Sequence, residues 1–96
     1  MAIWNSLRRE LDKAGQVAQD ALDEGRLRLE AHRARQRAEA AAASLGFAIY
    51  RARVAGGDLE LERYTIHAAS IATAEADVTR LERELAEVKA GRHSEP

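Results

Sequence analysis

The stretch "RARVAGGDLELERY", residues 51–64, decides the fold, because it places two adjacent glycines in a sequence that otherwise favours helix. Glycine adopts a left-handed backbone conformation at little steric cost, so Gly56 and Gly57 are suited to end a helix as its C-cap. Asp58 follows them and is a suitable N-cap for another helix. The stretch therefore predicts a tight turn that folds one long helix back along a second.

The composition agrees with an all-α fold. The chain has 96 residues, of which 46% are hydrophobic and only 4% aromatic, and Ala, Leu, Glu and Arg dominate, as in long helices and coiled coils. A chain of this length forms at most one small domain, here residues 1–96, with a modest core. The absence of cysteine excludes disulfides, thiolate metal sites and a cysteine nucleophile.

Apolar residues at three- and four-residue steps predict two helices, over 26–55 and 58–90, with a frayed tail at 91–96. The second helix has the most regular heptads, and we expect it to pack antiparallel on the first in a coiled-coil-like hairpin. A turn at 56–57 sets residue i opposite about residue 113 − i. The predicted seam consists of Ala38, Leu45, Ile49, Tyr64, Ile71, Val78, Leu81 and Leu85.

Residues 3–22 form a predicted amphipathic arm that extends beyond the reach of the second helix. A bend near Gly25 is expected to separate this arm from the first helix, because glycine costs roughly 1 kcal/mol relative to alanine in a helix. The arm either folds back as a third helix or packs against a second chain, and a two-fold homodimer is the favoured prediction. Its apolar contact residues are Trp4, Leu7, Leu11, Ala18 and Leu22.

Charge suggests a weaker alternative, in which the segment "RLRLEAHRARQR" (26–37) binds nucleic acid or another anionic surface. No aromatic residues are interleaved for base stacking, and the acidic face of the second helix is expected alongside, so a salt-bridged or solvated face is favoured. A membrane-surface role for the arm is disfavoured, because residues 1–22 carry no net charge. The candidate anion-binding residues are Arg26, Arg28, Arg33, Arg35 and Arg37.

We find no catalytic or cofactor-binding pattern and expect a non-enzymatic protein. His32, His67 and His93 are too far apart in the predicted hairpin to share a metal ion, and "AGGD" lacks the Lys-Ser/Thr of a phosphate loop. His67 lies at a seam position, where it is either a packed residue or a pH-sensing one. Without a signal-like or membrane-spanning apolar run, the expected location is the cytoplasm.

The motifs "IWNSL" (3–7), Leu45-Gly46, Ile49-Tyr50 and "AGGD" (55–58) resemble those of a loose group of small bacterial helical proteins of unknown function. The group combines a long charged helix, a glycine-containing turn and a coiled-coil second helix. Many of its members end in a cysteine-bearing zinc ribbon, which this chain lacks, so the resemblance implies the hairpin but no zinc site. We therefore expect an interaction or scaffold protein that self-associates through its helix faces.

Overall fold

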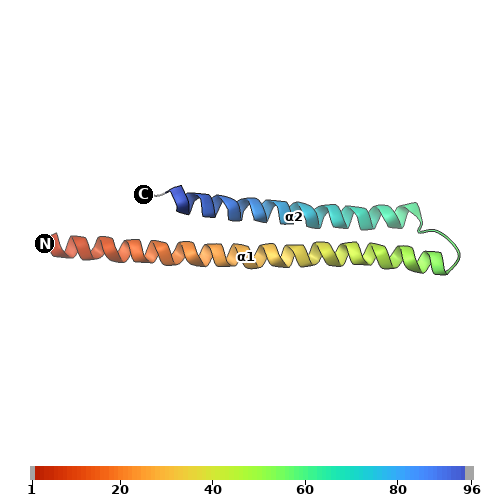
Figure 1. Cartoon of the computed structure of the whole chain (residues 1–96), viewed down its shortest axis with the longest axis horizontal. Helices are drawn as coiled ribbons and strands as arrows, with labels where there is room; N and C mark the ends of the chain where they lie inside the picture. The colour runs from red at the N-terminus through yellow and green to blue at the C-terminus, as the bar shows by residue number, and fades with distance from the viewer. Residues whose placement is uncertain (1, 95–96) are drawn as a thin grey trace.

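Two helices of unequal length form an antiparallel hairpin, as the glycine pair predicts (Figure 1). The computed structural model describes residues 2–94, with side-chain surroundings described as far as Gly91. Helix α1 spans Ala2–Val54 and helix α2 spans Leu61–Ser94. The described chain contains no strand, and the predicted all-α helical hairpin is confirmed.

The length of α1 determines the shape of the molecule. A helix of 53 residues rises about 80 Å at about 1.5 Å per residue, and the longest extent of the molecule is 82 Å against 17 Å in the other two directions. Helix α2 has 34 residues and lies beside the part of α1 that leads to the turn. The N-terminal part of α1 therefore projects beyond the end of α2 (Figure 1).

The turn is a Schellman motif centred on Gly56. The Gly57 amide donates to the Ala52 carbonyl at 3.0 Å, and the Gly56 amide donates to the Arg53 carbonyl at 3.0 Å. Gly56 has a φ of 91°, the left-handed conformation that this motif requires at the residue after the cap. The first helix therefore ends at the glycine pair, as predicted, and Gly56 is the glycine whose left-handed conformation ends it.

Asp58 does not begin the second helix, because α2 starts three residues later, at Leu61. The first helical hydrogen bond of α2 runs from the Tyr64 amide to the Glu60 carbonyl at 2.9 Å. The Asp58 carboxylate instead accepts a hydrogen bond from Arg53 at 2.8 Å, which ties the loop to the end of α1. With α1 ending at Val54 and α2 beginning at Leu61, residue i lies opposite about residue 115 − i (54 plus 61), two positions from the prediction.

The predicted bend near Gly25 is wrong, since α1 runs through this glycine without interruption. Side-chain pairs one turn apart bridge this part of the helix: Gln16 donates to Asp20 and Gln19 to Asp23, both at 3.1 Å, and Arg28 donates to Glu24 at 3.3 Å. Each such pair contributes a few tenths of a kcal/mol. Together with helix cooperativity they offset the cost of one glycine.

Helix α2 likewise continues through Gly91 to Ser94, so the predicted tail at 91–96 is helical over its first four residues. Residues 95–96 of that prediction lie outside the described part of the chain.

The seam between the helices has a small core. Ala31 and Ala34 are fully buried and Leu81 is 3% exposed, with Leu27 and Val78 packed against them. The small alanine side chains let α2 approach closely and let Leu81 fill the space between the helices. An ion pair between Arg35 and Glu82, at 3.1 Å, crosses the helices beside this core.

We expect Gly56→Ala to lower the free energy of unfolding by about 1–2 kcal/mol, the cost of placing an L side chain in the left-handed region. Gly57→Ala is the matched control, since a Cβ at Gly57 meets no atom within 4 Å and its φ is not positive. Thermal unfolding followed by circular dichroism measures both. Equal melting temperatures for the two variants would contradict the role assigned to Gly56.

Candidate protein interaction surface

The arm, residues 3–22, is the largest part of the chain without a partner helix. Helix α2 ends at Ser94, which lies opposite about residue 21 of α1 (115 minus 94). All arm side chains are exposed except that of Asp20, which is half-buried. Trp4 and Leu11 are each 71% exposed and Leu22 is 69% exposed, while Leu7 is 46% exposed. The fold-back of the arm as a third helix is therefore wrong, because the arm continues α1 in a straight line (Figure 1).

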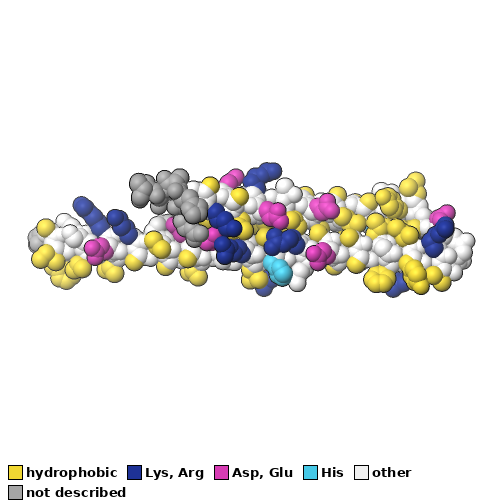
Figure 2. Space-filling view, viewed as in Figure 1, with side chains coloured by type: hydrophobic (Ala, Val, Ile, Leu, Met, Phe, Trp, Pro, Cys, Tyr) yellow, Lys and Arg dark blue, Asp and Glu magenta, His cyan; other side chains and the backbone are white. Residues whose placement is uncertain are grey.

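The sequence stripe on the arm omitted two further apolar residues. Ile3 and Val17 are 74% and 68% exposed and lie next to the stripe on the helix surface. Their signal was present in the sequence as apolar residues one position before Trp4 and Ala18. Figure 2 shows hydrophobic side chains gathered at this free end of α1 and again near the turn, with charged residues along the middle of the molecule.

A second exposed apolar region, which we call the turn-end patch, consists of Ala43, Gly46, Phe47 and Tyr50. Phe47 and Tyr50 are 61% and 66% exposed, and the Arg51 guanidinium lies 5.9 Å from the centre of the Phe47 ring. The sequence interpretation missed this patch, although Ala43, Phe47, Tyr50 and Val54 are spaced by four, three and four residues. Such spacing marks a helix face distinct from the seam.

The predicted seam residues fall into two groups. Ala38, Leu45, Ile71, Val78 and Leu85 are half-buried and Leu81 is buried. Ile49 and Tyr64 differ from the expectation, since they are exposed. On α1 the spacing continues from Leu45 to Ala48 and Ala52, both half-buried, which leaves Ile49 one position outside the contact. Tyr64 lies in the first turn of α2, beside the loop, where few neighbours cover it.

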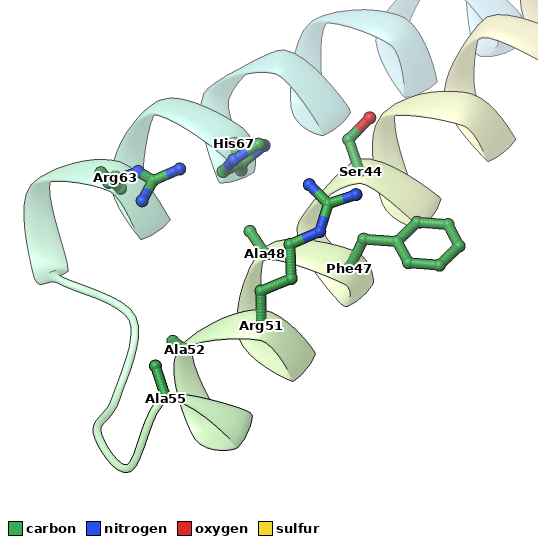
Figure 3. A pocket seen from close by; sticks show the side chains of 8 residues that line it. All are labelled: Ser44, Phe47, Ala48, Arg51, Ala52, Ala55, Arg63 and His67. Atoms are coloured by element: carbon green, nitrogen blue, oxygen red, sulfur yellow. The ribbon is translucent and has the colours of Figure 1, made fainter.

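A groove of about 480 Å³ lies between the helices next to the turn (Figure 3). Its walls are Ser44, Phe47, Ala48, Arg51, Ala52 and Ala55 from α1 and the residues that follow it, and Arg63 and His67 from α2. His67 is thus half-buried at the edge of an open groove rather than enclosed in the seam.

Three of the five candidate anion-binding arginines have acidic partners. Arg26 lies 3.8 Å from Asp23, Arg28 lies 3.3 Å from Glu24, and Arg35 lies 3.1 Å from Glu82. Arg37 lines a shallow groove that also contains Asp77. Arg33 is exposed, and no ion pair is recorded for it in the described residues. The arginines therefore do not form a uniformly positive strip.

Within residues 2–91, whose side chains are described, no cluster of three or more His, Asp or Glu side chains is arranged to hold a metal ion. Neither helix, over its described length, contains an apolar segment long enough to cross a lipid bilayer. Comparison of the chain with protein-family models, with curated proteins and with solved structures finds no match in any of the three. The resemblance to small bacterial helical proteins gains no support from these comparisons.

Proposed function

We propose that this chain is a non-enzymatic interaction or scaffold protein that self-associates through the apolar face of its arm. The proposal rests on one observation, that few apolar side chains are buried while several large ones lie exposed on the arm. Ala31, Ala34 and Leu81 are the buried apolar residues of the described chain, whereas Trp4, Leu7 and Leu11 lie exposed on one helix. A small domain with so small a core usually gains stability from further contacts, oligomerisation among them.

The energetics favour a reversible dimer. Burying a large apolar side chain contributes roughly 1.5–3 kcal/mol, and a two-fold dimer buries Trp4, Leu7 and Leu11 twice. Association itself costs roughly 4–15 kcal/mol in lost translational and rotational freedom. The favourable and unfavourable free energies are similar in size, so the proposed dimer forms at high concentration and dissociates on dilution. A two-fold homodimer is also the commonest closed assembly of identical chains.

The arginine-rich segment offers less support for an anion-binding function. Its arginines are exposed, and three of the five pair with acids on α1 and α2, which leaves little net positive field. Binding that depended on these arginines would fall steeply with added salt. An apolar arm contact would not, because screening acts on charges and not on buried apolar surface.

Trp4 is the single tryptophan of the chain and lies on the proposed contact, so its fluorescence reports association directly. We expect the emission to shift to longer wavelength on dilution through the micromolar range, in step with a fall from dimer to monomer mass by light scattering. Leu11→Glu should give the monomer and the exposed emission at every concentration. Asn5→Glu, on the opposite face of the arm, is the matched control and should behave like the parent.

A full-length chain that is monomeric throughout this range would overturn the proposal. A dimer that dissociates when salt is added would also count against it, since an apolar contact should persist.

A further inference from the structure

The apolar stripe of the arm faces a different direction from the seam. On α1 the seam runs through Leu27, Ala31 and Ala34, alternating steps of four and three residues. Counting back in the same alternation leads through Glu24, Asp20, Val17, Lys13, Glu10 and Ser6 to Ile3, a mainly polar series. The stripe of the arm is displaced from this series by one residue, which is about 100° around a helix of 3.6 residues per turn.

This displacement limits where a partner can approach. A helix that continued the line of α2 along the arm would lie against the acidic and basic side chains of the seam series, not against Trp4 and Leu7. The partner of the stripe must lie on a neighbouring face of α1, where it leaves α2 in place. The stripe ends at Gly25, its next position, where a Cβ would meet nothing within 4 Å.

The order of side-chain sizes along the stripe identifies the partner. The three N-terminal positions carry large side chains, Trp4, Leu7 and Leu11, and the three that follow carry small ones. The small residues are Ala14, Ala18 and Ala21. A second arm running in the opposite direction therefore places a large side chain against a small one in every layer.

The matching register sets residue i of one arm opposite residue 25 − i of the other. The layers are then Trp4 with Ala21, Leu7 with Ala18, and Leu11 with Ala14, each formed twice. A parallel pair would set Trp4 on Trp4 at one end and alanine on alanine at the other, which crowds the first layer and leaves space in the last. Helix interfaces pack to high density, and alternating large and small residues across facing positions achieves it.

We infer that the arm packs against the arm of a second copy of this chain. The two arms run antiparallel, and the two-fold axis that relates them passes between residues 12 and 13. This inference rests on the proposed self-association and adds its geometry. Ile3, Val17 and Leu22 flank the stripe and widen the contact. The net charge of zero over residues 1–22 means that two arms approach without repulsion. The two hairpins extend away from the paired arms in opposite directions.

Disulfide trapping tests the register, because the chain has no cysteine of its own. Leu7→Cys and Ala18→Cys chains, mixed and oxidised, should form a disulfide between unlike chains. Each variant alone should cross-link little, since residues 7 and 7 of two antiparallel arms are separated by 11 residues, about 16 Å along the helix, far beyond disulfide reach. Arg9→Cys with Gln16→Cys is the matched control, at equivalent levels but on outward faces, and should not cross-link.

A size exchange provides a second measurement that does not depend on thiols. Leu7→Ala empties two layers and should weaken the dimer about tenfold or more. Leu7→Ala combined with Ala18→Leu in the same chain restores one leucine and one alanine to each of those layers. We expect this double variant to recover most of the parental dissociation constant.

The outcomes separate this inference from the proposed function. Cross-linking of each cysteine variant with itself, or a double variant as weak as Leu7→Ala, would overturn the antiparallel register while the dimer stood. A parent chain that light scattering finds monomeric overturns both.

Discussion

Replacing Leu81 with aspartate should abolish the hairpin at room temperature. Leu81 is 3% exposed and fills the space beside the fully buried Ala31 and Ala34. The substitution removes this side chain and puts an unpaired carboxylate in its place, next to the Glu82 that pairs with Arg35. We expect a loss of more than about 3 kcal/mol in the free energy of unfolding. The hairpin has little more than that to lose, because Leu81 is one of three apolar residues buried in the described chain.

Ile66→Asp is the matched control for this substitution. Ile66 lies on the same helix and is 64% exposed, so an aspartate in its place should alter stability by no more than about 0.5 kcal/mol. Denaturant unfolding of both variants, followed by helical circular dichroism, compares them directly. If the Leu81 variant unfolded at the same denaturant concentration as the Ile66 variant, the core of the hairpin would lie elsewhere.

The seam of α2 was predictable because its heptads contrast strongly with their surroundings. Ile71, Val78, Leu81 and Leu85 are the large apolar residues of segment 71–85 and share one helix face, so only that face suits a partner. The seam of α1 was harder to assign, since alanines occur on every face of residues 38–43. Ala48 and Ile49 both lie one helical turn from Leu45, and Ile49 is the more hydrophobic of the two. The observed contact instead follows the seven-residue steps from Ala34 through Ala41 to Ala48.

The propensities of single residues failed as predictors where interactions with nearby side chains outweighed them. Gly25 is a weak helix residue, but the surrounding side-chain pairs and the cooperativity of a 53-residue helix keep it helical. Asp58 is a suitable N-cap by type, but its carboxylate is held by Arg53. Neither outcome follows from the residue's own propensity, because each depends on pairs of side chains four or five residues apart.

The arm was identifiable from length alone, because the second helix is too short to cover residues 3–22. The direction in which its apolar stripe faces was harder to predict. The stripe is displaced from the seam by one residue only if arm and hairpin share one continuous helix, and the predicted bend near Gly25 would have broken that relation. The turn-end patch was not predicted, because Leu45 and Ile49 form a second apolar stripe on another face of the same segment.

A chain that begins at Arg26 should be monomeric at every concentration at which the full chain is a dimer. The truncation removes all six layers of the proposed contact and retains the buried Ala31, Ala34 and Leu81, so the hairpin itself can still form. Because association stabilises the folded chain by mass action, the melting temperature of the full chain should rise with concentration. The melting temperature of the truncated chain should be constant and lower, and light scattering gives both masses.

The full chain carrying Leu7→Glu and Leu11→Glu is the control, since it keeps the length of α1 but loses the apolar face of the arm. It should be monomeric, as the truncated chain is. A different result points to the other exposed apolar region: if the truncated chain still dimerised and Phe47→Glu made it monomeric, the turn-end patch would be the contact between chains. The arm would then be left without a role in self-association, because its removal would have changed nothing that the dimer needs.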